Sequence, residues 1–154
     1  MSFKSKYKGL FKPQNPQKYL GDPTRIIFRS MYELKYMKFL DAHPDVLKWG
    51  SEEVIINYLA PDGRIRRYFP DFVVQLRNRK GEIEKLMVEI KPYVQTQPPK
   101  RPKKLTRKFL QEAETYAINK AKWAAATQFC EQKGLQFKVY TEHELGIKNG
   151  KVSN

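Results

Sequence analysis

The sequence contains few cysteines and histidines and no long apolar run. Cys130 is its single cysteine, and His43 and His143 are its two histidines, in a chain of 154 residues. An intramolecular disulfide is therefore impossible, and the usual ligand set of a structural zinc site is lacking. No apolar run approaches the ~18 residues that a membrane span requires, and the first residues lead into no apolar signal core. We therefore expect a reducing compartment and no membrane partner.

Acidic residues are scarce relative to basic ones. The chain has 30 Lys plus Arg against 16 Asp plus Glu, a formal net charge of +14. Residues 1–20 and 96–110 contain no acid and hold eleven of the fourteen excess charges. Each run taken alone is equally typical of a solvated surface, but two acid-free runs in one small chain favour a polyanion as the partner. The charge therefore predicts binding to the DNA backbone.

Aromatic residues make up 13% of the chain, too many for a disordered basic tail. At ~100–200 residues per domain, the length predicts one compact domain. Proline and lysine in the first segment indicate an extended arm, and the last residues indicate a frayed end. We expect a basic arm over 1–24, a folded domain over 25–146 and a flexible tail over 147–154.

Periodicity and capping residues predict a mixed α+β fold, with a mixed central sheet flanked by helices. Ser30 and Glu33 have the spacing of a capping box at the start of a first helix. Gly134 suits the end of a long second helix. The predicted elements are a helix over 30–42, strands over 53–59, 64–77 and 82–91, a helix over 105–133, and a strand over 135–141.

The second and third predicted strands form a hairpin whose turn fixes their register. Gly81 suits the left-handed position that closes a three-residue loop made of a type I turn and a bulge. Asn78 then pairs with Glu82, and Asp71 lies opposite Glu89. The same register gathers the apolar side chains of both strands on one face, which supports it.

Asp71, Glu89 and Lys91 fall together on the other face, because residues two apart in a strand point the same way. Opposed carboxylates repel each other unless a cation or a proton lies between them. Two acidic oxygens without His or Cys suit Mg²⁺, or Mn²⁺ in its place. Taken alone, Glu89 and Lys91 are better explained as a surface ion pair than as catalytic residues. Their conjunction with Asp71, beside two basic segments, favours catalysis on a phosphodiester.

The motifs Pro70-Asp71 and Glu89-x-Lys91, with the upstream helical Glu33, resemble those of the PD-(D/E)xK nuclease superfamily. The start of the first helix resembles that of TnsA-type transposase endonucleases. FRSMYELKYM, WGSEE, RYFPDF and VEIKP resemble segments of the head completion nucleases of T-even-like tailed bacteriophages, over about residues 6 to 145. The resemblance implies a restriction-endonuclease-like core.

The resemblance also implies roles for the site residues. Asp71 and Glu89 would bind the metal, with the backbone carbonyl of Ile90 as a further contact, and Lys91 would be the catalytic lysine. Glu33 would complete the site or bind a second ion, although a capping role explains its position almost equally well. TnsA-type enzymes can have Gln at the position of Glu89, and the acid here favours metal binding. The residues expected to contact DNA are Arg29, Lys100, Arg101, Lys103, Lys104, Arg107, Lys108 and Lys122.

These observations predict a metal-dependent DNA endonuclease or exonuclease with little sequence preference and no small-molecule cofactor. The resemblance implies a role in phage head completion, with head, portal or neck proteins as partners. The expected location is the host cytoplasm during assembly, with the virion as the alternative. Two other functions fit the sequence: a non-catalytic basic DNA-binding protein of the phage head, and a repair or junction-resolving nuclease of the same superfamily.

Overall fold

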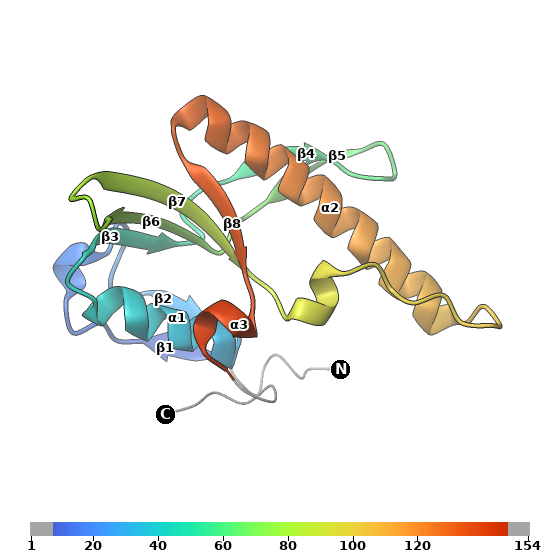
Figure 1. The fold of residues 1–154 in the computed structure, drawn as a ribbon, viewed down its shortest axis with the longest axis horizontal. Coiled ribbons are helices and arrows are strands. Elements are labelled where there is room, and N and C mark those ends of the chain that lie inside the picture. Colours follow the sequence, from blue (N-terminus) through green and yellow to red (C-terminus); the bar gives the residue numbers. More distant parts are fainter. Residues whose placement is uncertain (1–7, 148–154) are drawn as a thin grey trace.

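The centre of the molecule is a four-stranded mixed sheet (Figure 1). The structure, a computed structural model, describes residues 8–147. The sheet order is β3-β6-β7-β8, in which β8 runs parallel to β7 and the other neighbours are antiparallel. The strands are β3 (Val46–Ser51), β6 (Phe72–Arg77), β7 (Ile83–Ile90) and β8 (Gln136–Tyr140). The expected mixed α+β class is confirmed.

One face of the sheet is covered by the first helix and by the N-terminal part of the chain (Figure 1). This layer contains β1 (Gly9–Phe11), the 3-10 turn η2 (Pro16–Lys18), β2 (Ile26–Phe28), α1 (Met31–Ala42) and α3 (Glu142–Leu145). Met37 and Leu40 of α1 are fully buried against the sheet, and Trp49 of β3 is the largest side chain in this core. Burial of such side chains stabilises the domain by about 1.5–3 kcal/mol each.

The other face of the sheet is covered by the long helix α2 (Arg107–Lys133) and by a separate hairpin. That hairpin consists of β4 (Ile56–Leu59) and β5 (Ile65–Tyr68) and packs on α2. Met87 of β7 and Cys130 of α2 meet in this second core. The N-terminal half of α2 and the preceding segment, which contains η3 (Tyr93–Thr96), project beyond the sheet (Figure 1).

The hairpin register predicted from Gly81 is confirmed. Phe72 lies opposite Val88 and Arg77 opposite Ile83, and the amide N–H of Asn78 donates to the carbonyl of Glu82 at 2.8 Å. Gly81 has a φ of 78°, a conformation that glycine adopts without strain. The register also explains the division of the sheet, because one face of each strand joins the first core and the other joins the second.

The predicted strand over 64–77 is in fact two strands in two sheets. Phe69, Pro70 and Asp71 interrupt it, so β5 pairs with β4 and β6 pairs with β3 and β7. Proline cannot donate to a strand ladder, which makes Pro70 a natural point of separation. The strand β3 was not predicted. Of the strand predicted over 53–59, only the last four residues form a strand, and that strand is β4 of the smaller sheet.

Residues 8–24 do not form the extended arm that was expected. Phe11 and Tyr19 are buried in the first core, and Tyr19 packs edge-on against Trp49 with ring centroids 4.8 Å apart. Ile147, expected in the flexible tail, is also buried. The remaining parts of the predicted arm and tail, 1–7 and 148–154, lie outside the described residues. Within 8–147, none of the helices combines the length and apolarity needed to cross a membrane.

Candidate active site

Asp71, Glu89 and Lys91 meet at the end of the β6–β7 hairpin that is opposite its turn. One carboxylate oxygen of Asp71 accepts the backbone N–H of Ile90 at 2.7 Å. The Lys91 ammonium lies 3.9 Å from a carboxylate oxygen of Glu89, whose side chain is buried. The Asp71 bond joins the end of β6 to β7 beyond the last regular pair, so it fixes the carboxylate against the strand that carries Glu89 and Lys91.

Tyr68 orients Glu89 from the second sheet. Its hydroxyl donates a 2.8 Å hydrogen bond to Glu89 Oε1, and both side chains are buried. Burial, followed by the charge of Glu89, raises the pKa of Tyr68 well above its usual value, so the phenol remains a donor. The sequence did not reveal this contact, because it depends on the separation of β5 from β6 at Pro70.

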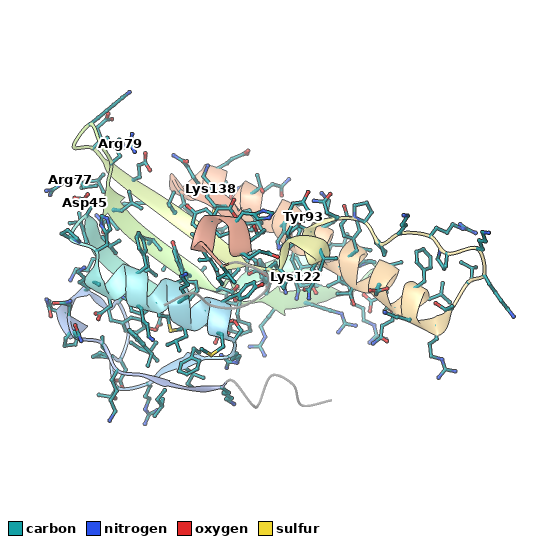
Figure 2. All side chains as sticks on the ribbon, turned by 60° about the horizontal axis from the view of Figure 1, so that its bottom comes forward. Asp45, Arg77, Arg79, Tyr93, Lys122 and Lys138 are labelled. Carbon is teal, nitrogen blue, oxygen red and sulfur yellow. The ribbon has the colours of Figure 1, made fainter. Side chains whose placement is uncertain are left out.

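Lys122 lies behind Tyr68 and not at the predicted DNA surface. Its ammonium is 5.6 Å from the ring centroid of Tyr68 and 5.9 Å from that of Tyr58. A cation over an aromatic face is a stabilising contact. Lys122 is partly buried here and does not line the cleft described below, and its role as a DNA contact stays a prediction. Figure 2 shows its position on α2.

Glu33 reaches the same end of the sheet from the start of α1. Ser30 accepts the N–H of Glu33 at 3.1 Å, as expected for an N-cap residue. The Glu33 carboxylate returns to the N–H of Arg29 at 2.8 Å, one residue before the position that a capping box would use. Glu33 therefore both caps the start of α1 and lies near the other acids.

A fourth carboxylate, that of Glu52, was not predicted. Glu52 follows β3 with a φ of 55°, and its N–H donates to the carbonyl of Asp71 at 3.1 Å. Its carboxylate lies 2.9 Å from the guanidinium of Arg29. A left-handed conformation costs a non-glycine residue about 1–2 kcal/mol, and such strain concentrates at functional sites. Arg29, predicted to contact DNA, is thus at the site but already paired.

The acids at this end of the molecule disfavour one another's ionisation. Burial raises the pKa of Asp71 well above its usual range, and the charges of Glu89 and Glu33 add to the effect. The Ile90 N–H and the Lys91 charge oppose that rise only in part. Burial is also the main cause of the raised pKa of Glu33, to which Glu52 and Glu89 contribute. The neighbouring positive charges are therefore too few to neutralise this carboxylate cluster when all of its members are ionised.

A broad cleft opens over the carboxylates, with a volume of about 1580 Å³. Asp71, Glu33 and Lys91 line it at the sheet, and the segment around Tyr93 and the N-terminal half of α2 line the other side. Lys100 and Lys108 line that second wall, and Arg101, Lys103, Lys104 and Arg107 are exposed in the segment between them. None of the six is ion-paired with a described residue. The second basic segment therefore reaches the cleft through two of its residues, and its contact with DNA stays a prediction.

The available oxygens fit a divalent cation. Ile90 N–H and Tyr68 O–H occupy one oxygen each of Asp71 and Glu89, which leaves a second oxygen on each carboxylate. Within residues 8–147, no three acidic, histidine or cysteine side chains form a complete metal cage. Mg²⁺ is usually held by one or two carboxylates together with water and substrate oxygens, so two suffice. The contact predicted for the carbonyl of Ile90 remains a prediction.

Comparison with known proteins identifies the family to which the chain belongs. The family model "TnsA-like endonuclease N terminal" matches residues 43–142, a range that includes Asp71, Glu89 and Lys91. The "Head completion nuclease" of Enterobacteria phage T4 is 38% identical over 144 residues, which cover 90% of this chain and 93% of that protein. The mixed sheet flanked by helices is consistent with a restriction-endonuclease-like domain. The chain belongs to the TnsA-like endonuclease family.

Proposed function

We propose that this chain is a metal-dependent DNA nuclease that hydrolyses phosphodiester bonds with little sequence preference. The observation that carries the proposal is the meeting of Asp71, Lys91 and Glu33 in one cleft, with the buried Glu89 beside them and a raised pKa at Asp71. Such a cluster is a costly arrangement for a merely structural surface and a common one for a site that receives a cation. Membership of an endonuclease family supports the same reaction class.

In this proposal Asp71 and Glu89 hold Mg²⁺ or Mn²⁺, with the Ile90 carbonyl as a further oxygen ligand. Glu33 completes the site or binds a second ion. A divalent ion bound there supplies positive charge that polarises the scissile phosphodiester. Lys91 holds the attacking water or the negative charge that develops on the phosphate. Tyr68 keeps Glu89 in one orientation through their 2.8 Å hydrogen bond.

The substrate is DNA, held mainly through its backbone. The cleft is larger than the ~300–1000 Å³ of typical small-molecule sites, and one wall carries Lys100 and Lys108. Exposed cations of this kind contact phosphates without reading bases, so binding will weaken steeply with salt. The other basic residues of the segment extend the same surface.

The biological setting we propose is phage head completion. The relative from phage T4 is named for that process, and it matches nearly the whole chain. The nuclease would process packaged DNA so that head and tail can join, with head, portal or neck proteins as partners. It would act in the host cytoplasm during assembly, or as part of the virion.

The proposal is tested with the purified chain and linear duplex DNA, in Mg²⁺ and in EDTA. We expect cleavage in Mg²⁺ alone, and a rate at least ~10³-fold lower for Asp71→Asn, since a ligand to the reacting centre is lost. The matched control is Asp45→Asn, an exposed aspartate at the far end of the sheet (Figure 2). A wild-type rate for Asp71→Asn would sink the site assignment.

Two alternatives are decided by the same assay. DNA binding that is indifferent to EDTA, without cleavage in any divalent cation, would favour a basic structural protein. Cleavage of branched DNA far faster than linear DNA would favour a junction-resolving nuclease.

A further inference from the structure

Asn119 of α2 is a buried polar side chain at the inner end of the cleft. It is 4% exposed, yet it lines the cleft together with Asp71 and Lys91. The other α2 residues that line the cleft are partly or fully exposed, and they extend outward along the helix toward Lys108. Asn119 is therefore the α2 side chain nearest the floor of the cleft.

The side-chain amide of Asn119 has no hydrogen-bond partner among residues 8–147. Most side-chain amides of nearly buried residues are hydrogen-bonded within the protein, so an amide without such a bond is available to a ligand. Among the described residues, the fully buried side-chain polar atoms without a partner are the indole nitrogens of Trp49 and Trp123, and neither residue lines the cleft. The amide atoms of Asn119 are not among them, so they keep a small exposure to solvent. Asn119 therefore presents an unpartnered amide to the cleft, where a ligand would enter.

A structural role does not account for this asparagine. The rest of the buried α2 surface is formed by small or apolar side chains, such as Ala126 and Cys130, that pack in the second core. The Asn119 amide thus lies beside the cleft without a hydrogen-bond partner among the described residues.

We propose that Asn119 is a substrate-binding residue of the nuclease, whose amide N–H donates to a non-bridging oxygen of the DNA phosphate at the cleavage point. This inference rests on the proposed function and adds a residue from the opposite wall of the cleft. Lys91 and Asn119 then approach the phosphate from the sheet and from the helix. A neutral donor is suited to this place, because it contacts the phosphate without pairing with the carboxylates in the way a lysine would.

The test uses Asn119→Ala and Asn119→Leu, with Gln128→Ala as the matched control. Gln128 is an exposed amide on the same helix outside the cleft. Leucine has the same branching at Cγ as asparagine but no polar atom, and alanine removes the whole branch, so the two variants together separate loss of the amide from loss of packing. We expect both Asn119 variants to lower kcat/KM for linear DNA at least ~10-fold, as removal of a phosphate-stabilising donor does.

A second measurement excludes a structural explanation. Thermal unfolding should show an unchanged or higher Tm for both Asn119 variants, because no bond within the protein is lost. DNA affinity measured in EDTA should fall about 3–10-fold for both variants, in line with the loss of one hydrogen bond. Gln128→Ala should match wild type in all three measurements.

The outcomes separate this inference from the proposed function. Wild-type cleavage and wild-type DNA affinity in both Asn119 variants would overturn the inference and leave the nuclease intact. A lower Tm together with unchanged kcat/KM would also overturn it, by showing a structural role. If the wild-type chain binds DNA without cleaving it, the proposed function fails. The affinity in EDTA then still decides whether Asn119 contacts DNA.

Discussion

The two ends of helix α1 carry charge in different ways. At the C-terminal end, Lys18 donates to the carbonyls of Leu40, Asp41 and His43 at 3.4, 3.0 and 2.7 Å. At the N-terminal end, Glu33 faces other carboxylates, and its pKa is raised mainly by burial. Both arrangements satisfy the helix dipole, which favours acids at its start and cations at its end. Only at the C-terminal end does the charged side chain have partners of favourable charge, because Lys18 faces carbonyl oxygens whereas Glu33 faces other carboxylates.

Asp41 makes the contrast sharper. Its carboxylate is buried and accepts the backbone N–H groups of Gln14 and Asn15 at 2.8 and 3.0 Å. Asp71 accepts one such bond and is otherwise surrounded by acids. A buried aspartate with complete hydrogen bonding locks a segment in place, whereas one crowded by like charge is poised for a cation. Burial alone therefore does not distinguish a structural aspartate such as Asp41 from a candidate site residue such as Asp71.

The same contrast divides the two basic segments. In the first, Lys18 is used to dock residues 14–18 on the end of α1, so part of that charge is structural. In the second, the cations are exposed beside the cleft. Two runs that look alike in the sequence therefore serve different purposes, because one finds partners within the fold and the other does not.

The largest expected effect lies at the N-terminal end of α1. Glu33→Gln should lower the cleavage rate about 10²–10³-fold while the Tm stays constant or rises, since glutamine can still accept the Arg29 N–H and relieves repulsion. Single-turnover cleavage and thermal melts measure the two quantities. Glu114→Gln, an exposed acid on α2 outside the cleft, is the control. A falling Tm with full activity would reduce Glu33 to a capping residue.

The next largest effect lies at the other end. Asp41→Ala should lower the free energy of unfolding by about 1–3 kcal/mol, because two partly buried backbone N–H groups lose their acceptor. Urea denaturation followed by circular dichroism measures it. Cleavage per folded molecule should stay within about twofold of wild type, because Asp41 does not line the cleft. If cleavage fell as it does for Glu33→Gln, the two ends would not be functionally distinct.

A smaller effect is expected from the second basic segment. Lys100→Ala with Lys104→Ala should weaken DNA binding about tenfold and reduce the slope of log affinity against log salt by about 2, as two phosphate contacts are lost. Fluorescence anisotropy across a salt series measures both. The matched control is Arg77→Ala with Arg79→Ala, at the turn end of the sheet away from Tyr93 (Figure 2). Equal losses in the two pairs would mean that the whole surface binds DNA without preference.

The smallest expected effect is on pH dependence, measured in EDTA. A raised pKa means that folded Asp71 binds protons more tightly than unfolded Asp71 does, so its contribution to stability falls as pH rises through the folded pKa. Asp71→Asn should therefore differ little from wild type near pH 4 and have a Tm a few degrees higher near pH 7, where ~1 kcal/mol corresponds to ~2–4 °C. A gap that shrinks with rising pH would contradict the crowding of charge around Asp71.

Local signals in the sequence were sufficient where one residue determines the geometry. Gly81 fixed the hairpin register, and that register brought Asp71 to Glu89 and Lys91. Gly134, with a φ of 74°, marked the end of α2. The mixed α+β class followed from these elements. The functional roles of the site residues are still predictions, since proximity does not measure chemistry.

Other features depended on contacts between distant segments. The strand β3 contains Lys48 and Gly50 beside Trp49, a composition without clear alternation, and its place is set by pairing with β6. The sequence also gave no sign that residues on both sides of Pro70 belong to different sheets, so Tyr68 was not linked to Glu89. Asn119 could not be distinguished from a surface residue until α2 was placed beside the cleft.

The burial of Cys130 has a practical consequence for labelling. It is the single thiol of the chain, it lies in the second core, and burial raises its pKa to about 11. A thiol with so little thiolate at neutral pH reacts slowly with maleimides. Lys80→Cys, at the exposed hairpin turn, would therefore accept a fluorophore selectively. That dye would sit at the end of the sheet opposite the cleft, where it can report DNA capture without occupying the path of the DNA.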